Sequence, residues 1–555
     1  MKTTNILSLA FAAMMASAAY AQQPLSIEHL KDGHAQVRVA ADQKCLLLPI
    51  EENAPECFIK VQVDNSTAYT FTARLAVDKV DFTVPFDLQP YQGKELTFEV
   101  NTPHQDRHSS REPKWTSTVQ KANGFDVTNR EKYRPEFHHT PAYGWMNDPN
   151  GMFYLDGTWH LYYQYNPYGS RWGNMNWAHA TSTDLIHWEE QGVAIAADGI
   201  GTIFSGSCVV DHKNTAGFGK GAVIALYTSD GIAQRQCMAY STDGGKTFTK
   251  YPGNPILSAD IPDFRDPNMF WNEDINAWNL ILACGQEMRI YSSPNLRDWK
   301  EESRFGLGYG SHDGVWECPD LMRLPAPVAK GEQPHDKWVL FCNINPGFPA
   351  GGSGTQYFIG DFDGHKFTCD TAPEVTKWQD YGKDHYATVS FSNAPEGRHT
   401  MIAWMSNWQY ANDVPTQQYR SGNSIGREPF LYTGADGQLY LGSAPSPEYD
   451  GAGLDKTLKI KGDATITLSN EEGEEFVIRY DQKAMTLSCD RSRSGETDFS
   501  KEFAVPMTAP VHKKLTSLRI FIDRSSVEVF GNNGEVVMTN LVFPKSTYNN
   551  ISITK

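Results

Sequence analysis

Hydrophobic and polar residues alternate along most of this chain. In residues 22–129, segments such as AQVRVA, FIKVQV and LTFEV place an apolar residue at every second position. This period is typical of a half-buried β-strand, whose side chains point alternately to opposite faces of a sheet. Long apolar runs at helical spacing are scarce. The pattern predicts an all-β protein whose residues 22–129 form an N-terminal β domain.

An imperfect repeat occupies residues 134–432. Its copies are ATSTDLIHWEE, AYSTDGGKTFTKY, IYSSPNLRDWKEE and IGDFDGHKFT, and each reads as a strand, a turn and an aromatic residue. The aromatic residues are Trp188, Phe248, Trp299 and Phe367, separated by 60, 51 and 68 residues. This spacing suits units of four strands, and small sheets repeated around an axis make a β-propeller. The alternative is a string of ordinary hairpins, because Asp-Gly turns are common.

The last part of the chain, residues 451–555, returns to strand alternation. Segments such as ATITLS, EFVIRY and AMTLSC are separated by turns, as in a β-sandwich. Within SLRIFIDRSSVEVF we expect Asp523 and Glu528 to lie at the surface or at an interface, without a catalytic role.

Residues 1–21 have the pattern of a secretory signal peptide. Lys2 precedes an apolar stretch over residues 6–15, and small residues follow up to Ala21. A membrane span needs about 20 apolar residues, more than this stretch offers. The sequence therefore predicts cleavage after about Ala21 and export, either to a periplasm or to the medium.

Composition narrows the partners that the chain can have. With 555 residues, of which 40% are hydrophobic, the chain is too large for one ordinary core. Its formal net charge is −17 and it has no long block of Lys and Arg. A nucleic acid or an anionic membrane requires a positive surface, so we expect neither as a partner. A neutral ligand fits better, and the oligomeric state stays open.

Cysteine and histidine give no indication of a metal or another cofactor. The nine Cys are too thinly spread for a disulfide framework, and only Cys45 and Cys57 are close enough to suggest a local bridge. His138 and His139 are adjacent but have no third ligand nearby in the sequence. We therefore predict no metal site and no cofactor.

Three acidic residues are the candidates for chemistry. Asp148 lies in WMNDPNG, Asp266 follows 118 residues later in FRDP, and Glu317 follows 51 residues after that in WECPD. Each stands beside aromatic residues and is followed by Pro or Cys-Pro. Alone, each acid could cap a turn, and NDPNG could simply form a tight turn. A propeller, however, brings loops from distant blades together at one end of its axis.

Two of these acids fit the roles that a retaining glycosidase needs, a nucleophile and a protonated acid about 5–5.5 Å apart. A short Asp148 on a rigid segment suits attack on the anomeric carbon. The apolar neighbours of Glu317 could raise its pKa and keep it protonated. Asp266 should remain ionised if Arg265 also lies close in space, and it would then hold sugar hydroxyls.

The three motifs resemble those of glycoside hydrolase family 32, the β-fructosidases that include invertases, inulinases and levanases. WMNDPNG, RDP and EC are its specific motifs, and the likeness runs from about Arg134 to the C-terminus. The resemblance implies a five-bladed β-propeller followed by a β-sandwich. It also implies that Asp148 is the nucleophile, Asp266 the transition-state stabiliser and Glu317 the acid/base.

Neighbouring segments add residues whose aromatic rings and polar groups suit a furanose ring and its hydroxyls. We expect the substrate to be bound by Asn147, Gln164, Trp172, Phe204, Ser205, Ser207, Arg265 and Trp404. The chain departs from the family at Asn176 and Ala178, where His and Gly are frequent, and at Gly426, where Pro is usual. These departures leave the preferred acceptor open. The resemblance does not cover the N-terminal β domain, for which structural support is favoured over contact with carbohydrate.

We hypothesise an exported hydrolase that releases fructose from β-fructans such as levan or inulin, with sucrose as a short substrate. It would act through a covalent fructosyl intermediate on Asp148, and we favour terminal over internal cleavage. The alternatives are an endo-acting levanase or inulinase, a fructosyltransferase on the same fold, and a non-catalytic fructan-binding propeller. A sialidase is disfavoured, since it would need an Arg cluster and a Tyr nucleophile.

Overall fold

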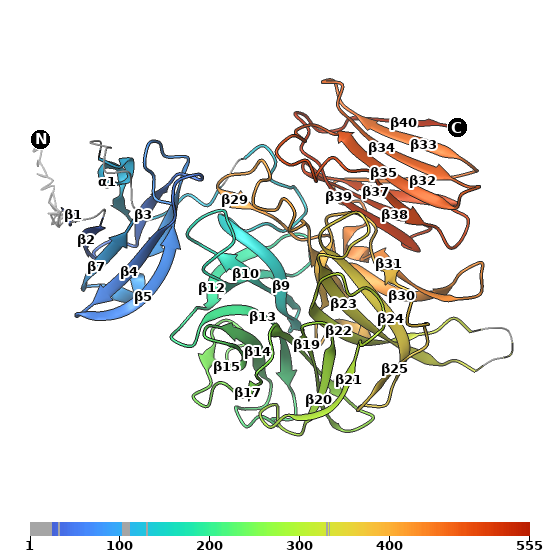
Figure 1. Cartoon of the computed structure of the whole chain (residues 1–555), viewed down its shortest axis with the longest axis horizontal. Helices are drawn as coiled ribbons and strands as arrows, with labels where there is room; N and C mark the ends of the chain where they lie inside the picture. The colour runs from blue at the N-terminus through green and yellow to red at the C-terminus, as the bar shows by residue number, and fades with distance from the viewer. Residues whose placement is uncertain (1–24, 31–33, 103–111, 129–130, 329–330, 332) are drawn as a thin grey trace, which may run out of the picture.

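The computed structural model describes residues 25–555 apart from 31–33, 103–111, 129–130, 329–330 and 332. Strands account for 51% of the chain and helices for 3%, so the all-β prediction is confirmed. The predicted signal peptide lies outside the described residues. No helix among the described residues is long and apolar enough to cross a membrane. Figure 1 shows the N-terminal strands in blue and the C-terminal strands in red, packed at separate places against the middle part of the chain.

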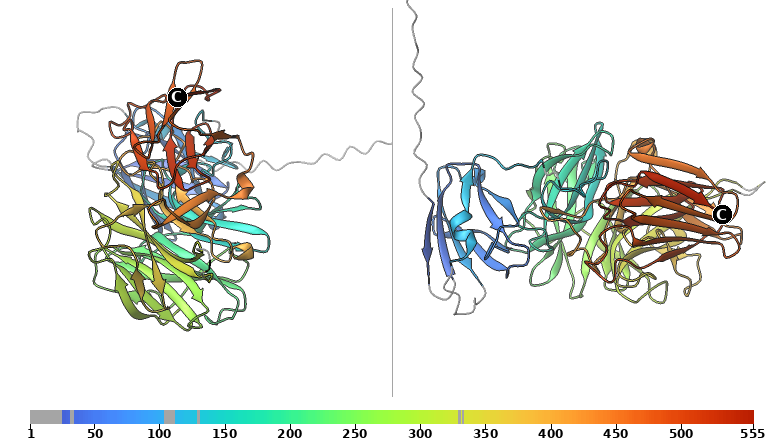
Figure 2. Two further views of the ribbon diagram at one scale, coloured as in Figure 1. Left: turned by 90° about the vertical axis from the view of Figure 1, so that its right-hand side faces the viewer. Right: turned by 90° about the horizontal axis from the view of Figure 1, so that it is seen from above.

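Two antiparallel sheets form the N-terminal part, with a hydrophobic core between them (Figure 2). One sheet has the order β1-β2-β7-β4-β5 and the other β6-β3-β8. Their strands are β1 (Ser26–His29), β2 (His34–Ala40), β3 (Cys45–Ile50), β4 (Cys57–Val63), β5 (Ser66–Ala73), β6 (Phe82–Asp87), β7 (Glu95–Asn101) and β8 (Gln120–Ala122). A short helix, α1 (Lys114–Thr118), precedes β8. Ile59, Val61 and Val63 of β4 are buried at alternate positions, as the sequence pattern predicts.

The local bridge suggested for Cys45 and Cys57 is wrong, because both thiols are free and buried. Cys45 begins β3 and Cys57 begins β4, and these strands belong to different sheets. Each thiol instead donates to a main-chain carbonyl, Cys45 to Ala122 and Cys57 to Pro55.

Five sheets follow one another in residues 144–445. Their orders are β12-β11-β10-β9-β29, β13-β14-β15-β16 with β17, β18-β19-β20-β21, β22-β23-β24-β25 with β26, and β27-β28-β30-β31. The first strands of these sheets are β9 (Gly144–Leu155), β13 (Thr202–Asp211), β18 (Phe264–Asn272), β22 (Val315–Pro325) and β27 (Tyr386–Ser390). Each first strand contacts the next, and β27 contacts β9, so the five strands close a ring.

The remaining strands of the ring extend outward from these first strands, except β29, which pairs with the other side of β9. They are β10 (Thr158–Asn166), β11 (Asn176–Ser182), β12 (Glu189–Ile195), β14 (Ala222–Asp230), β15 (Gln234–Ser241), β16 (Thr249–Lys250), β17 (Leu257–Ser258), β19 (Ala277–Cys284), β20 (Met288–Ser293), β21 (Lys300–Phe305), β23 (Asp336–Asn345), β24 (Gly354–Phe362), β25 (Phe367–Cys369), β26 (Lys377–Trp378), β28 (Met401–Trp404), β29 (Tyr419–Arg420), β30 (Arg427–Thr433) and β31 (Leu439–Pro445). The four copies of the sequence repeat are the hairpins β11–β12, β15–β16, β20–β21 and β24–β25. The repeat therefore marks the same third-to-fourth-strand hairpin in four sheets.

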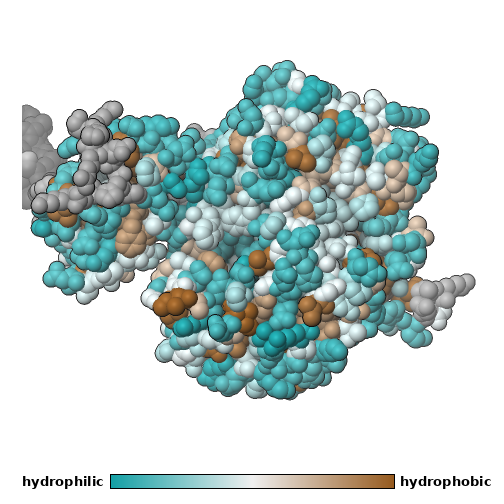
Figure 3. Space-filling model, viewed as in Figure 1, coloured by the Kyte–Doolittle hydropathy of each residue, from teal (hydrophilic) through white to brown (hydrophobic). Residues whose placement is uncertain are grey.

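The C-terminal part is again two antiparallel sheets around a buried core. Their orders are β32-β37-β38-β39 and β36-β35-β34-β33-β40. The strands are β32 (Leu454–Lys459), β33 (Ala464–Ser469), β34 (Glu475–Asp481), β35 (Thr486–Arg493), β36 (Met507–Pro510), β37 (Ser517–Ile522), β38 (Ser526–Gly531), β39 (Val536–Leu541) and β40 (Asn550–Thr554). The face of the molecule shown in Figure 3 is mostly hydrophilic, with hydrophobic residues in small groups.

Asp523 and Glu528, which we expected at the surface or at an interface, are buried at an interface, where the C-terminal sheets pack against the ring. Asp523 accepts from Nδ1 of His138 at 2.8 Å, and Glu528 pairs with Nε2 of the same ring at 2.8 Å. Glu528 also pairs with Arg427 of β30. The two acids lie at an interface within the chain, where buried cations compensate their charges.

Candidate active site

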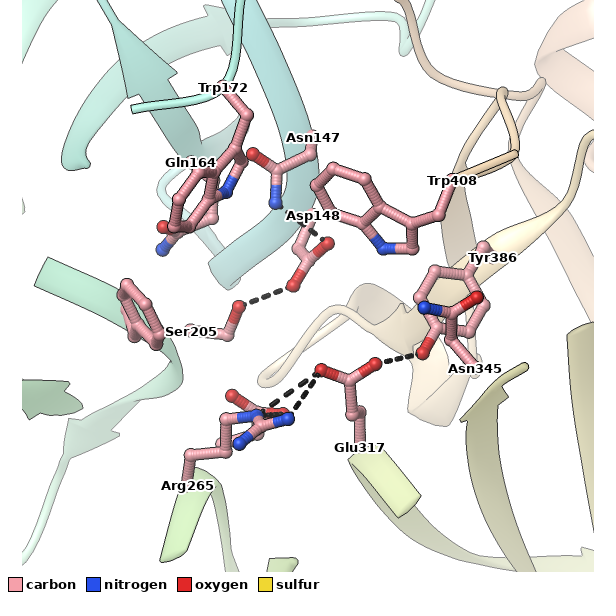
Figure 4. A pocket seen from close by; sticks show the side chains of 12 residues that line it. Asn147, Asp148, Gln164, Trp172, Ser205, Arg265, Glu317, Asn345, Tyr386 and Trp408 are labelled. Atoms are coloured by element: carbon pink, nitrogen blue, oxygen red, sulfur yellow. Dashed lines mark hydrogen bonds and ion pairs between the residues drawn. The ribbon is translucent and has the colours of Figure 1, made fainter. Parts of the chain in front are cut away.

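A cavity of about 300 Å³ opens where the first strands of the ring begin (Figure 4). Each first strand supplies at least one polar side chain to it, among them Asp148 from β9, Ser205 from β13, Asp266 from β18, Glu317 from β22 and Tyr386 from β27. The complete lining is Asn147, Asp148, Gln164, Trp172, Phe204, Ser205, Arg265, Asp266, Glu317, Asn345, Tyr386 and Trp408.

A register shift in the pairing with the second strand occurs at this point in all five first strands. The shifts fall within residues 146–149, 203–206, 265–268, 317–320 and 386–389. Bulges of this kind bend a strand and re-aim its side chains. Pro149, Pro267 and Pro319 follow the three acids within one or two residues. Pro fits such a position because it has no N–H to donate to a neighbouring strand. The tight turn considered for NDPNG is therefore wrong, because this segment is a bulge within β9.

Asp148 is held by neutral donors. Ser205 Oγ donates to its Oδ2 at 2.6 Å, and Asn147 Nδ2 donates to its Oδ1 at 3.0 Å. Trp145 Nε1 in turn donates to Oδ1 of Asn147 at 2.8 Å, which fixes the orientation of that amide. These bonds use lone pairs on both carboxyl oxygens and therefore fix the orientation of the Asp148 side chain. The carboxylate points into the cavity (Figure 4).

Glu317 faces the same cavity in a different environment. Burial raises the pKa of its carboxyl, the charge of Arg265 opposes this, and the charge of Asp148 adds to the increase. Arg265 donates to Oε1 from two nitrogens, at 3.0 and 3.2 Å, and the hydroxyl of Tyr386 bonds to Oε2. The raised pKa agrees with the sequence-based expectation. Trp316, however, is turned away and fully buried, so the adjacent ring in sequence is not part of the lining.

Asp266 is the most deeply buried of the three acids. Its Oδ2 accepts the backbone N–H of Cys318 at 2.9 Å, and both residues have positive φ, 65° and 41°. Burial raises the pKa of Asp266 to about 7, an effect that Arg265 reduces and the charges of Glu317 and Asp148 increase. The expectation that Arg265 keeps Asp266 ionised is thus met only in part. The guanidinium lies 3.9 Å from Asp266 but is closer to Glu317, at 3.0 Å.

Cys318 links the acids through its side chain. Its Sγ lies 3.4 Å from Oδ2 of Asp148 and 3.6 Å from Oδ2 of Asp266. Burial raises its pKa well above the ordinary value, so the thiol stays protonated and can donate weakly to either carboxylate. The Cys of the EC motif therefore packs beneath the two aspartates.

Two of the residues predicted to bind substrate do not line the cavity. Ser207 accepts the backbone N–H of Met269 at 2.9 Å and faces another cavity, further along the ring. Trp404 is fully buried, and its ring lies 4.8 Å from that of Trp408, which takes the place in the lining. Trp404 therefore supports the wall of the cavity from behind.

Sequence reasoning missed Asn345, Tyr386 and Trp408. Trp408 lies four residues after Trp404 in the segment AWMSNW, so the segment was found but the wrong ring was chosen. Tyr386 begins β27 beside a bulge whose Ala387 has a φ of 53°. Neither Tyr386 nor Asn345 stands in an acidic motif. Among the described residues, no group of three or more His, Cys, Asp or Glu side chains could hold a metal ion.

Three family models match the chain. Residues 138–442 match the glycosyl hydrolases family 32 N-terminal domain and residues 442–555 match the glycosyl hydrolases family 32 C terminal. Residues 31–137 match a domain of unknown function, DUF4980.

Similar proteins and solved structures agree with these family matches. The levanase of Bacillus subtilis is 43% identical over 458 residues, which cover 75% of this chain and 67% of that protein. The extracellular exo-inulinase of Aspergillus awamori is 36% identical over 491 residues, covering 75% of this chain and 90% of that protein. The crystal structure of exo-inulinase from Aspergillus awamori superposes with a TM-score of 0.70 at 34% identity, over 78% of this chain and 96% of that chain.

Proposed function

This chain belongs to the glycosyl hydrolases of family 32, and on that premise we propose that it releases terminal fructose units from levan or inulin by a retaining mechanism. It is a glycoside hydrolase of the β-fructofuranosidase type, which hydrolyses fructans or sucrose and releases fructose. The observation that carries the mechanism is the pair Asp148 and Glu317, which line one cavity in different environments: Ser205 donates to Asp148, whereas burial raises the pKa of Glu317.

In the first step an oxygen of Asp148 attacks the anomeric carbon of the bound fructose. The bond from that carbon to the leaving oxygen breaks, and Glu317 donates its proton to this oxygen. In the second step Glu317 takes a proton from water, whose oxygen attacks the same carbon and releases Asp148. Arg265 donates to one oxygen of the Glu317 carboxyl and Tyr386 bonds to the other. These bonds fix the orientation of the group that transfers the proton.

Asp266 acts on the substrate rather than on the proton. Its Oδ2 is bonded to the backbone of Cys318, so the carboxyl is fixed at the floor of the cavity next to Asp148. A buried acceptor in that position bonds sugar hydroxyls, and such bonds strengthen in the transition state. Trp172, Phe204 and Trp408 offer apolar faces to the furanose ring.

The proposal includes the architecture and the cellular location. We take the ring of five sheets as the five blades of the propeller and the two C-terminal sheets as the sandwich. Export is supported by the signal-peptide pattern of residues 1–21 and by relatives named extracellular exo-inulinase. Terminal cleavage is supported by the same names.

Chromatography of early products from levan and from inulin tests the proposal. Free fructose without intermediate oligomers is expected from both polymers. A ladder of oligomers would show internal cleavage instead, and lengthened products at high sucrose would show transfer to another sugar. A protein that binds fructans without any turnover, and whose Asp148→Ala variant behaves identically, would overturn the catalytic proposal.

A further inference from the structure

The segment 166–176, which joins β10 to β11, carries Trp172 into the wall of the active-site cavity. Three of its contacts, however, are made with the N-terminal part of the chain. We propose that the N-terminal domain positions Trp172 for substrate binding and that Glu52 is the positioning residue. This inference rests on the proposed function and extends it, because it assigns a role in the reaction to a domain outside the family 32 match.

Glu52 is the centre of the first contact. It follows β3, and its side chain is only 11% exposed. Its carboxylate lies 2.6 Å from Nη1 of the buried Arg420 and accepts a hydrogen bond from Ser170 Oγ at 3.1 Å. It also lies 3.6 Å from Nε of Arg171. A single carboxylate therefore joins the N-terminal domain to the residues directly before Trp172 and to β29 of the ring.

Aromatic packing makes the second contact. Tyr168 leaves the ring and joins the hydrophobic core of the N-terminal domain, where it is 9% exposed. Its ring is stacked on Phe71 with the centroids 4.0 Å apart, and it lies 6.1 Å from both Phe86 and Tyr69. The buried ring of Tyr168 therefore anchors the segment at a point four residues before Trp172.

Asn174 makes the third contact, on the other side of Trp172. Its Oδ1 accepts the backbone N–H of Thr72 at 2.8 Å, and its Nδ2 donates to the carbonyl of Thr72 at 2.9 Å. The side chain thus pairs with β5 as a neighbouring strand would. Asn174 has a φ of 45°, a conformation that Asn tolerates better than most residues.

Trp172 itself has few restraints. The residue is 45% exposed. Its backbone N–H donates to Oδ1 of Asn412 at 3.2 Å, and its ring lies edge-on to that of Phe204 with the centroids 6.2 Å apart. Asn166 of β10 donates to the carbonyl of Arg171 at 2.8 Å and Arg420 donates to that of Ser170 at 3.0 Å, and Arg420 is itself paired with Glu52. The position of the indole therefore depends on these bonds together with the three contacts that flank it. If they are loosened, the segment must be ordered when substrate binds, and that cost appears in substrate affinity.

The test uses the full-length protein and the variant Glu52→Gln, assayed on sucrose and on levan. We expect KM to rise about fivefold while kcat stays within about twofold, because Trp172 contributes to binding more than to the chemical step. Glu99→Gln is the matched control, since it breaks a 3.2 Å ion pair with Lys60 in the same domain but away from the segment. Asn174→Gly removes the third contact without leaving a buried charge, and it should raise KM in the same way.

A double-mutant cycle distinguishes positioning from general support. In a Trp172→Ala background, Glu52→Gln should no longer change KM, since its effect passes through the indole. An unchanged KM in Glu52→Gln and Asn174→Gly, with a lowered unfolding temperature, would reduce the domain to a structural support and overturn the inference. A KM increase that persists in the Trp172→Ala background would do the same. Absence of turnover in the unaltered protein would instead refute the proposed function.

Discussion

At the scale of single residues, the central feature is a pair of carboxyl groups in one cavity with different surroundings. Asp148 receives hydrogen bonds from Ser205 and Asn147, whereas burial and the nearby charge of Asp148 raise the pKa of Glu317. These different environments suit Asp148 to the role of nucleophile and Glu317 to that of acid. Two predictions concern these two carboxyl groups and the side chains that hold them.

Removal of the proposed acid should affect substrates according to their leaving group. Glu317→Ala should lower kcat on levan or sucrose by about 10²–10⁴, the usual contribution of general acid catalysis. A fructoside with a leaving group that needs no proton should keep its first step nearly unchanged. Comparing the rates of leaving-group release in the first turnover on the two kinds of substrate checks this, because the second step needs Glu317 as the base with every substrate. An equal loss in that first step on both would contradict the acid role.

Tyr386 should set the alkaline limit of activity. Its hydroxyl bonds to Glu317 and lowers the pKa of that carboxyl, in opposition to burial. Tyr386→Phe should therefore raise the pKa of Glu317 and keep the acid protonated to higher pH. The alkaline limb of the kcat/KM profile is expected to move upward.

The matched control for this change is Tyr432→Phe, whose hydroxyl bonds to the carbonyl of Glu535 away from the site. A profile of Tyr386→Phe that coincides with the profile of this control would argue against the assigned bond.

At the scale of single elements, the decisive features are the bulges in the first strands. Gly151 ends the WMNDPNG motif with a φ of 49°, and a Cβ there would lie 2.7 Å from the ring of Trp177 and 2.9 Å from Sγ of Cys208. Both backbone and packing therefore require Gly three residues after the nucleophile. Gly157, in the turn from β9 to β10, also has positive φ, 85°, but open space around it.

We predict different effects on stability when each of these two glycines is replaced by Ala, with Gly157→Ala as the reference. Gly157→Ala should cost about 1–2 kcal/mol, the strain of a left-handed conformation. Gly151→Ala should cost about 1–3 kcal/mol more because of overpacking, and it should also lower kcat by displacing Asp148. Thermal unfolding and kcat of the two variants check this. Equal effects of the two changes would show that the steric contacts of Gly151 are unimportant.

The sequence located strands in all three parts of the chain but only four of the five equivalent hairpins. The fifth is β30–β31, and residues 405–426 separate β30 from β28 before it. Part of that excursion, β29, pairs in parallel with Gly144 and Trp145 of β9. A pairing between residues so distant in the chain leaves no local pattern in the sequence.

At the scale of the whole molecule, a buried charge network joins the ring to the C-terminal sheets. His138 bonds to Asp523 and Glu528, Glu528 pairs with Arg427, and Arg427 pairs with Asp380 at 2.8 Å. Burial alone would lower the pKa of His138, but the two carboxylates outweigh it and raise the value to about 9. The imidazolium is therefore part of the folded structure at neutral pH.

The network predicts how stability depends on pH. Because the folded pKa of His138 lies above its ordinary value of 6.5, its contribution is complete below about 6.5 and is lost as pH rises through about 9. Burial opposes ionisation of Glu528, but Arg427 and His138 lower its pKa to about 2, so its contribution is lost as pH falls from about 4.5 to 2. The apparent unfolding temperature should thus be highest between these limits.

The variant His138→Gln should flatten the alkaline fall in unfolding temperature, whereas His187→Gln, at an exposed pair with Asp184, should leave it unchanged. An unaltered pH dependence in His138→Gln would exclude this residue as its source.

The sequence by itself determined the all-β class, the three acids and most of the cavity wall, because alternation and short motifs are local properties of the chain. Only the tertiary structure decided that Trp408 rather than Trp404 lines the cavity, and that Asp523 and Glu528 are buried. It also placed Glu52, almost 120 residues before Ser170, against the segment that holds Trp172. The reason is physical. The burial of a side chain and the distant cation that it pairs with depend on how whole sheets pack against one another, and the local sequence of a strand does not specify which sheet packs against it.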